Sequence, residues 1–296
     1  MRNPVFTGSG VAIVTPFQGG FVDYDKLGEL IDFQIENGTS AIIICGTTGE
    51  ASTLSTPEHL STIEYAVRKV AGRVPVIAGT GSNDTPHALE MSQSAETSGA
   101  DALLIVTPYY NKTTQHGLVK HYEYIADRVN IPIILYNVPS RTGMCFTAET
   151  YAELAKHPNI AGVKEASGNF SLALQTRTLC PGDFYIWSGN DQETVPLMSL
   201  GAKGVISVAA NVIPREMTDM CALYAAGKTD EAAALQIKYS NLCDSLFIEV
   251  NPVPVKTALN LMGRDVGPLR MPLCDMTPAH VDALKRSLLA AGIELV

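Results

Sequence analysis

The chain has 296 residues, 46% of them hydrophobic, and carries a formal net charge of −9 at pH 7. An acidic chain without a basic cluster is a poor partner for a phosphate backbone, which argues against nucleic-acid binding. No apolar stretch approaches the roughly 20 residues that span a bilayer, and the first run, Val11–Val14, is too short for a signal-peptide core, so we expect a cytoplasmic protein without a membrane partner.

Short apolar runs recur along the chain, and we interpret eight of them as strands. They are almost continuously apolar rather than alternating, which is typical of strands buried on both faces of a parallel sheet. The runs are Val11–Val14, Ala41–Cys45, Val76–Ala78, Leu103–Val106, Ile133–Tyr136, Ile160–Val163, Tyr185–Trp187 and Val205–Val208.

Helical patterns separate these runs. Apolar residues recur at three- and four-residue spacing, as between Leu27 and Ile35. Ser55 followed by Glu58 has the spacing of a capping box, which opens a helix. Eight strands alternating with helices predict an α/β fold of the (β/α)8 TIM-barrel type. The alternative is a doubly wound sheet, which is disfavoured because no G-x-G-x-x-G follows the first strand.

The strand-like runs stop after about residue 225. Two stripes at helical spacing follow, one from Ala232 to Leu246 and one from Val281 to Leu288. We therefore expect a catalytic barrel over residues 1–225 and a C-terminal helical appendage over residues 226–296.

The residue types that bind metals are dispersed. The six cysteines form no C-x-x-C pair, the six histidines are scattered, and no Cys/His group has zinc spacing, so no metal site is expected. Cysteines that lie in apolar runs are typically buried and reduced. After the seventh strand, Asp191 and Glu193 are expected to be solvated loop carboxylates.

Lys164 ends the apolar run Ile160–Val163 and is followed by a loop of small residues. An ammonium at the end of a buried strand costs desolvation energy unless it has a partner or a task. Burial favours the neutral amine, a nucleophile that forms a Schiff base with a carbonyl compound. The alternative is that Lys164 pairs with Glu165 or extends its ammonium to solvent.

Other strand ends carry hydroxyl groups and a guanidinium. The second strand ends in Gly46–Glu50, GTTGE, whose glycines allow a tight turn with backbone N–H groups that suit a carboxylate. Tyr136 ends the fifth strand, and Arg141 follows it. A phenol transfers protons, and an arginine binds carboxylates bidentately. The alternatives are an ordinary turn, a rim tyrosine and a surface arginine.

Three motifs at these strand ends are Gly46–Glu50, Tyr136–Pro139 and Val163–Ala166. Together they resemble the pyruvate-dependent class I aldolases, the superfamily of N-acetylneuraminate lyase. Further segments resemble the branch that condenses pyruvate with L-aspartate 4-semialdehyde at the entry to lysine biosynthesis, and they are Thr107–Asn111, Pro139–Gly143 and Asn251–Lys256. The resemblance extends over nearly the whole chain, in the expected order.

The resemblance implies a lyase that needs no cofactor and no metal. Lys164 would form the imine with pyruvate, and Tyr136 would donate and accept protons. Thr47 and Tyr110 would complete a proton relay, with Tyr110 reaching in from a neighbouring subunit. The usual assembly of the superfamily branch is a homotetramer made of two tight dimers.

The resemblance also assigns the substrate-binding positions. Thr48 and the backbone at Ile206 would hold the pyruvate carboxylate, with Gly189 beside the substrates. Arg141 would bind the carboxylate of the semialdehyde.

Lysine-sensitive members of the branch bind lysine at the tight-dimer interface. Positions that fit or adjoin that site are Ala51, Ser52, His59, Asn83 and Tyr109. Thr56 stands where sensitive bacterial members commonly carry histidine, and His87 where they carry glutamate. Because His87 offers no negative charge to a lysine ammonium, weak or absent feedback inhibition is expected.

Two other functions remain open from the sequence. A sibling aldolase cleaving N-acetylneuraminate or a 2-keto-3-deoxy sugar acid would share the lysine and the tyrosine, but such siblings generally lack an arginine at position 141. A non-catalytic keto-acid sensor on the same scaffold would lack the lysine or part of the relay, and none of these residues is missing.

Overall fold

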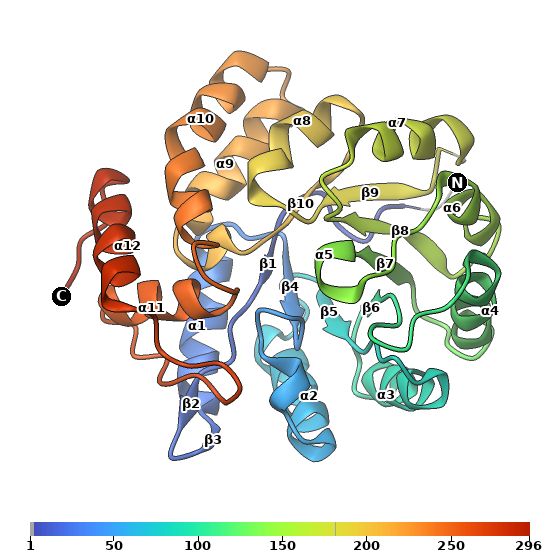
Figure 1. Ribbon diagram of the computed structural model, residues 1–296, viewed down its shortest axis with the longest axis horizontal. Helices are drawn as coiled ribbons and strands as arrows, with labels where there is room; N and C mark the ends of the chain where they lie inside the picture. The colour runs from blue at the N-terminus through green and yellow to red at the C-terminus, as the bar shows by residue number, and fades with distance from the viewer. Residues whose placement is uncertain (1–2, 181) are drawn as a thin grey trace.

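The computed structural model describes residues 3–180 and 182–296, and its centre is a closed barrel of eight parallel strands surrounded by helices (Figure 1). The barrel closes where β1 pairs with both β4 and β10. The strands are β1 (Gly8–Ala12), β4 (Ala41–Ile44), β5 (Val76–Gly79), β6 (Ala102–Val106), β7 (Ile133–Asn137), β8 (Ile160–Glu165), β9 (Tyr185–Ser188) and β10 (Gly204–Ser207). The predicted TIM barrel is confirmed, and the doubly wound alternative is wrong because the sheet has no open edge.

Helices connect consecutive strands on the outside of the barrel. The predicted capping box opens the second of them: Ser55 Oγ accepts the Glu58 N–H, and the Glu58 carboxylate accepts the Ser55 N–H. The helices are α1 (Tyr24–Glu36), α2 (Thr56–Val70), α3 (Thr85–Thr97), α4 (Gln115–Ala126), α5 (Pro139–Thr142), α6 (Ala148–Leu154), α7 (Phe170–Leu179), α8 (Thr194–Ser199) and α9 (Pro214–Ala225).

The first strand begins three residues earlier than the run Val11–Val14 predicted. Its opening residues, Gly8 to Gly10, are small and polar, yet they pair with β10. A Cβ on Gly10 would lie 2.9 Å from the ring of Phe6, which is buried inside the barrel. The small residues leave room for Phe6, so a search for apolar runs does not detect this half of the strand.

Three helices follow residue 225: α10 (Thr229–Ser245), α11 (Val253–Leu261) and α12 (Pro278–Ala290), of which α10 and α12 coincide with the two predicted helical stripes. The α12 helix packs against both α10 and α11, and α10 also packs against α9 of the barrel. The sequence did not predict α11 as a helix, nor the small antiparallel hairpin of β2 (Phe17–Gln18) and β3 (Phe21–Val22).

The buried side chains form two clusters. The larger one fills the space between the strands and the helices, and the smaller one lies inside the barrel. Within the barrel, Phe6 stacks on Trp187 with ring centroids 5.4 Å apart, and Trp187 Nε1 donates to the Phe6 carbonyl at 3.2 Å. This packing fills part of the barrel interior, and in barrels of this type ligands bind at the carboxyl ends of the strands.

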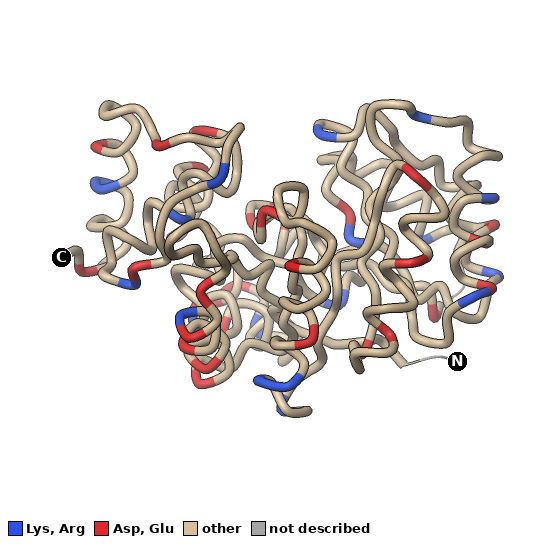
Figure 2. The backbone as a smooth tube through the Cα atoms, turned by 90° about the horizontal axis from the view of Figure 1, so that it is seen from below, with Lys and Arg blue, Asp and Glu red and all other residues tan. Residues whose placement is uncertain are grey.

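Among the described residues, the Asp, Glu, Lys and Arg side chains that are buried are Glu50, Lys164, Glu165, Asp191 and Lys256, and the others are at least partly exposed. Figure 2 shows lysines and arginines interspersed with aspartates and glutamates along the chain. Within residues 3–180 and 182–296, no helix has both the length and the apolar character needed to cross a membrane.

Candidate active site

Lys164 lies near the carboxyl end of β8, in register with Tyr136 of β7 and Trp187 of β9. Since side chains alternate along a strand and neighbours in register share a face, these three point to the same side of the sheet, the barrel interior. Lys164 is only 5% exposed, and its Nζ lies 4.4 Å from the centroid of the Tyr136 ring. The structure therefore brings together the predicted nucleophile and the predicted proton carrier.

Glu165, the next residue, points outward to the helices. Its carboxylate accepts hydrogen bonds from Asn137 Nδ2 at 3.0 and 3.1 Å, from the Tyr151 hydroxyl at 3.0 Å and from the Ser167 N–H at 2.8 Å. Burial raises the pKa of Glu165 against the effect of these donors. The alternative in which Lys164 pairs with Glu165 is wrong, because the two side chains lie on opposite faces of β8.

The segment Gly46–Glu50 forms the predicted tight turn after β4. The Gly49 N–H donates to the Gly46 carbonyl and the Glu50 N–H to the Thr47 carbonyl, each at 3.1 Å. Glu50 adopts a left-handed conformation with φ at 53°. The turn buries Thr48 and leaves Thr47 half-buried at the barrel mouth.

A buried ion pair anchors this turn, and sequence reasoning missed it. Lys256 Nζ lies 2.9 Å from Glu50 Oε1, and both side chains are almost wholly buried. The ammonium also donates to the carbonyls of Thr15 at 3.0 Å and Pro268 at 2.6 Å, while Glu50 Oε2 accepts the Arg270 N–H. The only signal in the sequence was that Lys256 closes a recognised motif of unassigned purpose.

Asn251 connects the two sides of the barrel mouth. Its Nδ2 donates to Thr48 Oγ1 at 3.0 Å, and its carbonyl accepts a hydrogen bond from Arg141 Nη2 at 3.0 Å. The side chains predicted to bind the two substrate carboxylates are thus linked through one residue of the turn between α10 and α11. Asn251 was not predicted as a site residue.

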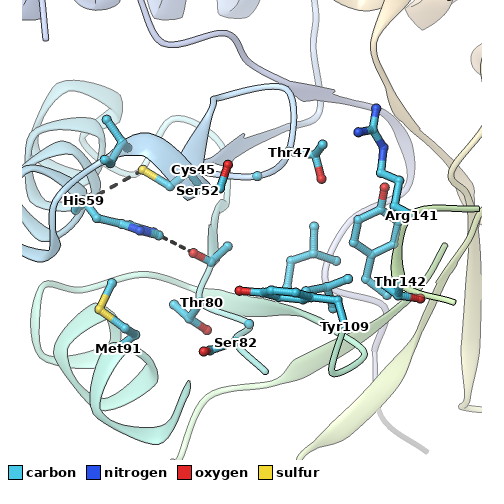
Figure 3. Close-up of a pocket in the computed structure, with 18 of the residues that line it drawn as sticks. Cys45, Thr47, Ser52, His59, Thr80, Ser82, Met91, Tyr109, Arg141 and Thr142 are labelled. Atoms are coloured by element: carbon cyan, nitrogen blue, oxygen red, sulfur yellow. Dashed lines mark hydrogen bonds between the residues drawn. The ribbon is translucent and has the colours of Figure 1, made fainter. Parts of the chain in front are cut away.

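A cavity of about 400 Å³ opens at the carboxyl ends of β4 to β7. Figure 3 shows Thr47 and Arg141 at one end of it and His59 and Met91 at the other. The predicted site residues that line it are Thr47, Ala51, Ser52, His59, Tyr109, Tyr136 and Arg141. Those that do not line it are Thr48, Asn83, Tyr110, Lys164, Gly189 and Ile206.

Tyr110 is directed away from the cavity of its own chain. Its side chain is 90% exposed, and its backbone has a φ of 69°, whereas the neighbouring Tyr109 lines the cavity. The Asn111 amide donates to the Asn83 carbonyl at 3.0 Å, which ties this loop to the one after β5.

The far end of the cavity carries two histidines. His59 Nε2 lies 2.8 Å from the Gly79 carbonyl, and burial lowers the pKa of His59, so a neutral ring donates this bond (Figure 3). His87 Nδ1 lies 3.9 Å from Glu90 Oε2 on the same helix. Thr56 and His87 also line the cavity, whereas Glu90 does not.

The remaining predicted positions are Ile206 in β10 and Gly189 directly after β9. Ile206 is buried in β10 and pairs with Gly10 of β1. The Gly189 N–H donates to the Glu165 carbonyl at 2.7 Å, and a Cβ on Gly189 would lie 2.6 Å from the Cβ of Ala166. Only glycine fits at this close approach of the chain to the end of β8.

Asp191 corrects a sequence-based expectation. It is 3% exposed rather than solvated, and its Oδ2 accepts the N–H groups of Val208 at 3.2 Å and Ala209 at 2.9 Å. Glu193, in contrast, is half-buried and accepts a hydrogen bond from Asn190. Because the whole loop is polar, its sequence does not show which of the two carboxylates is buried.

The six cysteines are all free, as expected, and four of them are buried. Burial raises the pKa of their thiols, as at Cys180, where it reaches about 11. Across the described residues 3–180 and 182–296, no three His, Cys, Asp or Glu side chains are grouped in a way that would hold a metal ion.

The chain is similar to known proteins over nearly its whole length. The model of the dihydrodipicolinate synthetase family matches residues 5–291. The chain is 55% identical over 291 residues to the 4-hydroxy-tetrahydrodipicolinate synthase of Thermoanaerobacter sp. (strain X514), covering 98% of each chain. It is 54% identical over 293 residues to the same-named protein of Acetivibrio thermocellus, covering 99% of this chain and 100% of the relative.

Solved structures agree with the sequence comparison. The crystal structure of DHDPS (dihydrodipicolinate synthase) from Cyanidioschyzon merolae with lysine bound matches with a TM-score of 0.96 at 41% identity. The match covers 99% of this chain and 100% of that one.

Proposed function

The chain belongs to the dihydrodipicolinate synthetase family, and from that premise we propose a role for each residue at the barrel mouth. Its reaction is the condensation of pyruvate with L-aspartate 4-semialdehyde to 4-hydroxy-tetrahydrodipicolinate, the first committed step of lysine biosynthesis through diaminopimelate. It is a lyase of the class I aldolase type.

Lys164 is the residue that binds pyruvate covalently. The observation that carries this assignment is the burial of its ammonium inside the barrel mouth, against the Tyr136 ring. The neutral amine adds to C2 of pyruvate, and loss of water gives an imine. The imine withdraws electrons, so C3 loses a proton and the resulting enamine attacks the aldehyde carbon. The amine of the semialdehyde then adds to C2, closes the ring and releases Lys164.

Tyr136 carries protons to and from these intermediates, with Thr47 as its partner in the relay. Both line the same cavity, which supports the pairing. Tyr110 completes the relay in the active site of another subunit, and its 90% exposure is consistent with a side chain that inserts into a partner. This role requires at least a dimer, and we propose the homotetramer made of two tight dimers.

The two substrate carboxylates have separate sites. Thr48 and the backbone at Ile206 hold the carboxylate of pyruvate. Gly189 borders this pyruvate site, because a glycine lets the backbone approach it closely. Arg141 binds the carboxylate of the semialdehyde, supported by its place on the cavity wall and by its bond to Asn251. Charged hydrogen bonds of this kind contribute roughly 1.5–3 kcal/mol each.

We further propose a catalytic unit of residues 1–225 with a helical unit of residues 226–296, and a cytoplasmic location. The cavity end beside Ala51, Ser52, His59, Asn83 and Tyr109 is proposed as a weakened lysine site.

A coupled assay separates this function from that of a sibling aldolase. The purified chain is given pyruvate with L-aspartate semialdehyde, and in a parallel reaction N-acetylneuraminate alone. Turnover of the first pair and not of the second is the expected result. Cleavage of N-acetylneuraminate at a comparable kcat/KM would contradict the assignment.

A further inference from the structure

The buried pair of Lys256 and Glu50 joins the C-terminal helices to the turn after β4 and takes no part in the proposed chemistry. Lys256 lies on α11, and its ammonium directs its three N–H donors to Glu50 and to the carbonyls of Thr15 and Pro268. Burial lowers the pKa of Lys256, whereas the adjacent Glu50 carboxylate favours the charged ammonium. Because the residue is only 1% exposed, a substrate cannot reach this amine.

Glu50 is fixed through both its side chain and its backbone. One carboxylate oxygen accepts from Lys256, and the other accepts the Arg270 N–H at 2.9 Å. The Glu50 N–H donates to the Thr47 carbonyl at 3.1 Å, and the Glu50 carbonyl accepts the Thr53 hydroxyl at 3.0 Å. Its φ of 53° lies in the left-handed region, which is costly for a residue with a side chain and persists only where surrounding contacts hold it.

These contacts fix the two threonines that the proposed function places at the substrates. Thr47, the relay partner, is bonded through its carbonyl to the Glu50 N–H. Thr48, at the pyruvate carboxylate, is followed by Gly49, whose carbonyl accepts the Thr15 hydroxyl at 2.7 Å. Thr15 in turn accepts the ammonium of the pair through its own carbonyl. A displacement of the ion pair therefore reaches both threonines through backbone hydrogen bonds.

A buried ion pair contributes little net stability, yet it restricts geometry. The desolvation of two charges offsets much of their attraction, so apolar side chains of similar volume often stabilise a fold as well. Here an apolar pair would leave the carbonyls of Thr15 and Pro268 without this donor and the Arg270 N–H without this acceptor. The charged pair therefore serves to fix one position of the turn.

We propose that Lys256 and Glu50 are positioning residues for the condensation. Their ion pair holds the turn after β4 so that its two threonines keep their places beside Tyr136 and the pyruvate carboxylate. The inference rests on the proposed function, and neither residue touches a substrate. Arg141 belongs to α5, after β7, so the semialdehyde site is the part of the barrel mouth that should change least.

The test combines a pyruvate titration with steady-state kinetics. Glu50→Gln keeps the size of the side chain and removes its charge, and Lys256→Met removes the ammonium. In each variant the pyruvate concentration that gives half-maximal borohydride adduct should rise about tenfold, because Thr48 loses a hydrogen bond to a charged group. The kcat should fall roughly 10- to 100-fold, because small displacements of catalytic groups are costly. KM for the semialdehyde should stay nearly unchanged.

A loss of stability alone gives a different pattern, which a control variant shows. Leu154→Ala removes a buried side chain from α6, a helix that packs against α4 and α7. It should lower the free energy of unfolding and leave both the half-maximal pyruvate concentration and KM unchanged, because only the folded fraction falls. If Glu50→Gln and Lys256→Met reproduced this pattern, the pair would be merely structural and the proposal would be overturned.

The double variant of Glu50→Gln with Lys256→Met separates charge from position. It leaves no unpaired buried charge, so it should recover part of the stability lost in the single variants. Its half-maximal pyruvate concentration should stay raised, because the hydrogen bonds that fixed the turn are still missing. Recovery of the unaltered pyruvate affinity and kcat would overturn the proposal. Should the single variants fail to fold, the double variant decides alone.

Failure of the proposed function gives a separate result. If the unaltered chain forms no borohydride adduct with pyruvate, the role of Lys164 is refuted, and this inference falls with it. If the unaltered chain forms the adduct and condenses the two substrates, while the folded variants keep its pyruvate affinity and kcat, only the inference is refuted.

Discussion

Arg141 is oriented at the barrel mouth by a single neutral acceptor, the Asn251 carbonyl, so most of its guanidinium donors are available to a ligand. We expect Arg141→Ala to raise KM for the semialdehyde by roughly 10- to 150-fold, corresponding to about 1.5–3 kcal/mol for a charged hydrogen bond. KM for pyruvate should change much less. Steady-state kinetics with each substrate varied in turn provide the measurement.

Arg128 offers a matched control for this variant. It is another arginine, placed over the exposed ring of Tyr124 on the outer surface. Arg128→Ala should leave both KM values unchanged. Equal kinetic constants for Arg141→Ala and the unaltered chain would remove the carboxylate role.

For single residues, the sequence reveals a functional role when the residue type is unexpected at that position. Lys164 stands out because it ends an apolar strand, and it lies beside Tyr136 as the alternation of strands requires. Asp191 and Lys256 escape notice because their burial depends on contacts with residues distant in sequence. Lys256 contacts Glu50 across 206 positions, and no local pattern encodes that pairing.

Among the elements, the start of α2 carries a pH-dependent contact. Glu58, the capping-box residue, also accepts hydrogen bonds from Arg270 at 2.6 and 3.0 Å, which lower its pKa to about 2. Because the folded-state pKa lies below the usual 4.5, this contact stabilises the fold above pH 4.5, and the stabilisation is lost as pH falls from 4.5 toward 2.

Glu58→Gln should therefore destabilise the protein at pH 7 by about 1–2 kcal/mol, a value reduced for the partial exposure of the pair. The loss should shrink as the pH falls toward 3. Denaturant unfolding of both proteins at a series of pH values gives the comparison, with Glu64→Gln as the control because that carboxylate is largely exposed and pairs only with the exposed Arg68. A destabilisation that is constant across this pH range would contradict the ionic account.

The accuracy of the element predictions follows from how each element is buried. The barrel strands were found from apolar runs because parallel strands are covered on both faces. The start of β1 was missed because Gly8 to Gly10 make room for Phe6, and the β2–β3 hairpin was missed because strands of two residues have no period. The α11 helix was missed because two prolines near its start hide the helical pattern.

The proposed role of Tyr110 concerns the whole assembly, because it needs a second subunit to receive this exposed side chain. We expect Tyr110→Phe to lower kcat while leaving the oligomer intact, because only the hydroxyl of the proposed relay is removed. Sedimentation analysis reports the assembly, and steady-state kinetics report kcat. Tyr124→Phe, at another exposed tyrosine, should change neither. An unaltered kcat in Tyr110→Phe would remove the hydroxyl from the relay.

Lysine sensitivity also concerns the whole molecule. At the proposed lysine site His87 offers no carboxylate and Glu90 does not line the cavity, so binding of lysine should be weakened roughly 10- to 150-fold by the lack of one charged hydrogen bond. A lysine titration of the condensation at saturating pyruvate and neutral pH should reach half-inhibition only at millimolar concentrations or above. Half-inhibition well below the millimolar range would show that other groups hold the ammonium.

The central claim is that Lys164 forms a Schiff base with pyruvate, and borohydride reduction tests it most directly. Reduction in the presence of pyruvate should add one pyruvate-derived mass to the intact chain, located on Lys164 by peptide mapping. Lys164→Ala should show no such mass and nearly no turnover. Lys164→Arg should behave alike, because a guanidinium stays protonated and forms no imine. A full adduct in either variant would contradict the account.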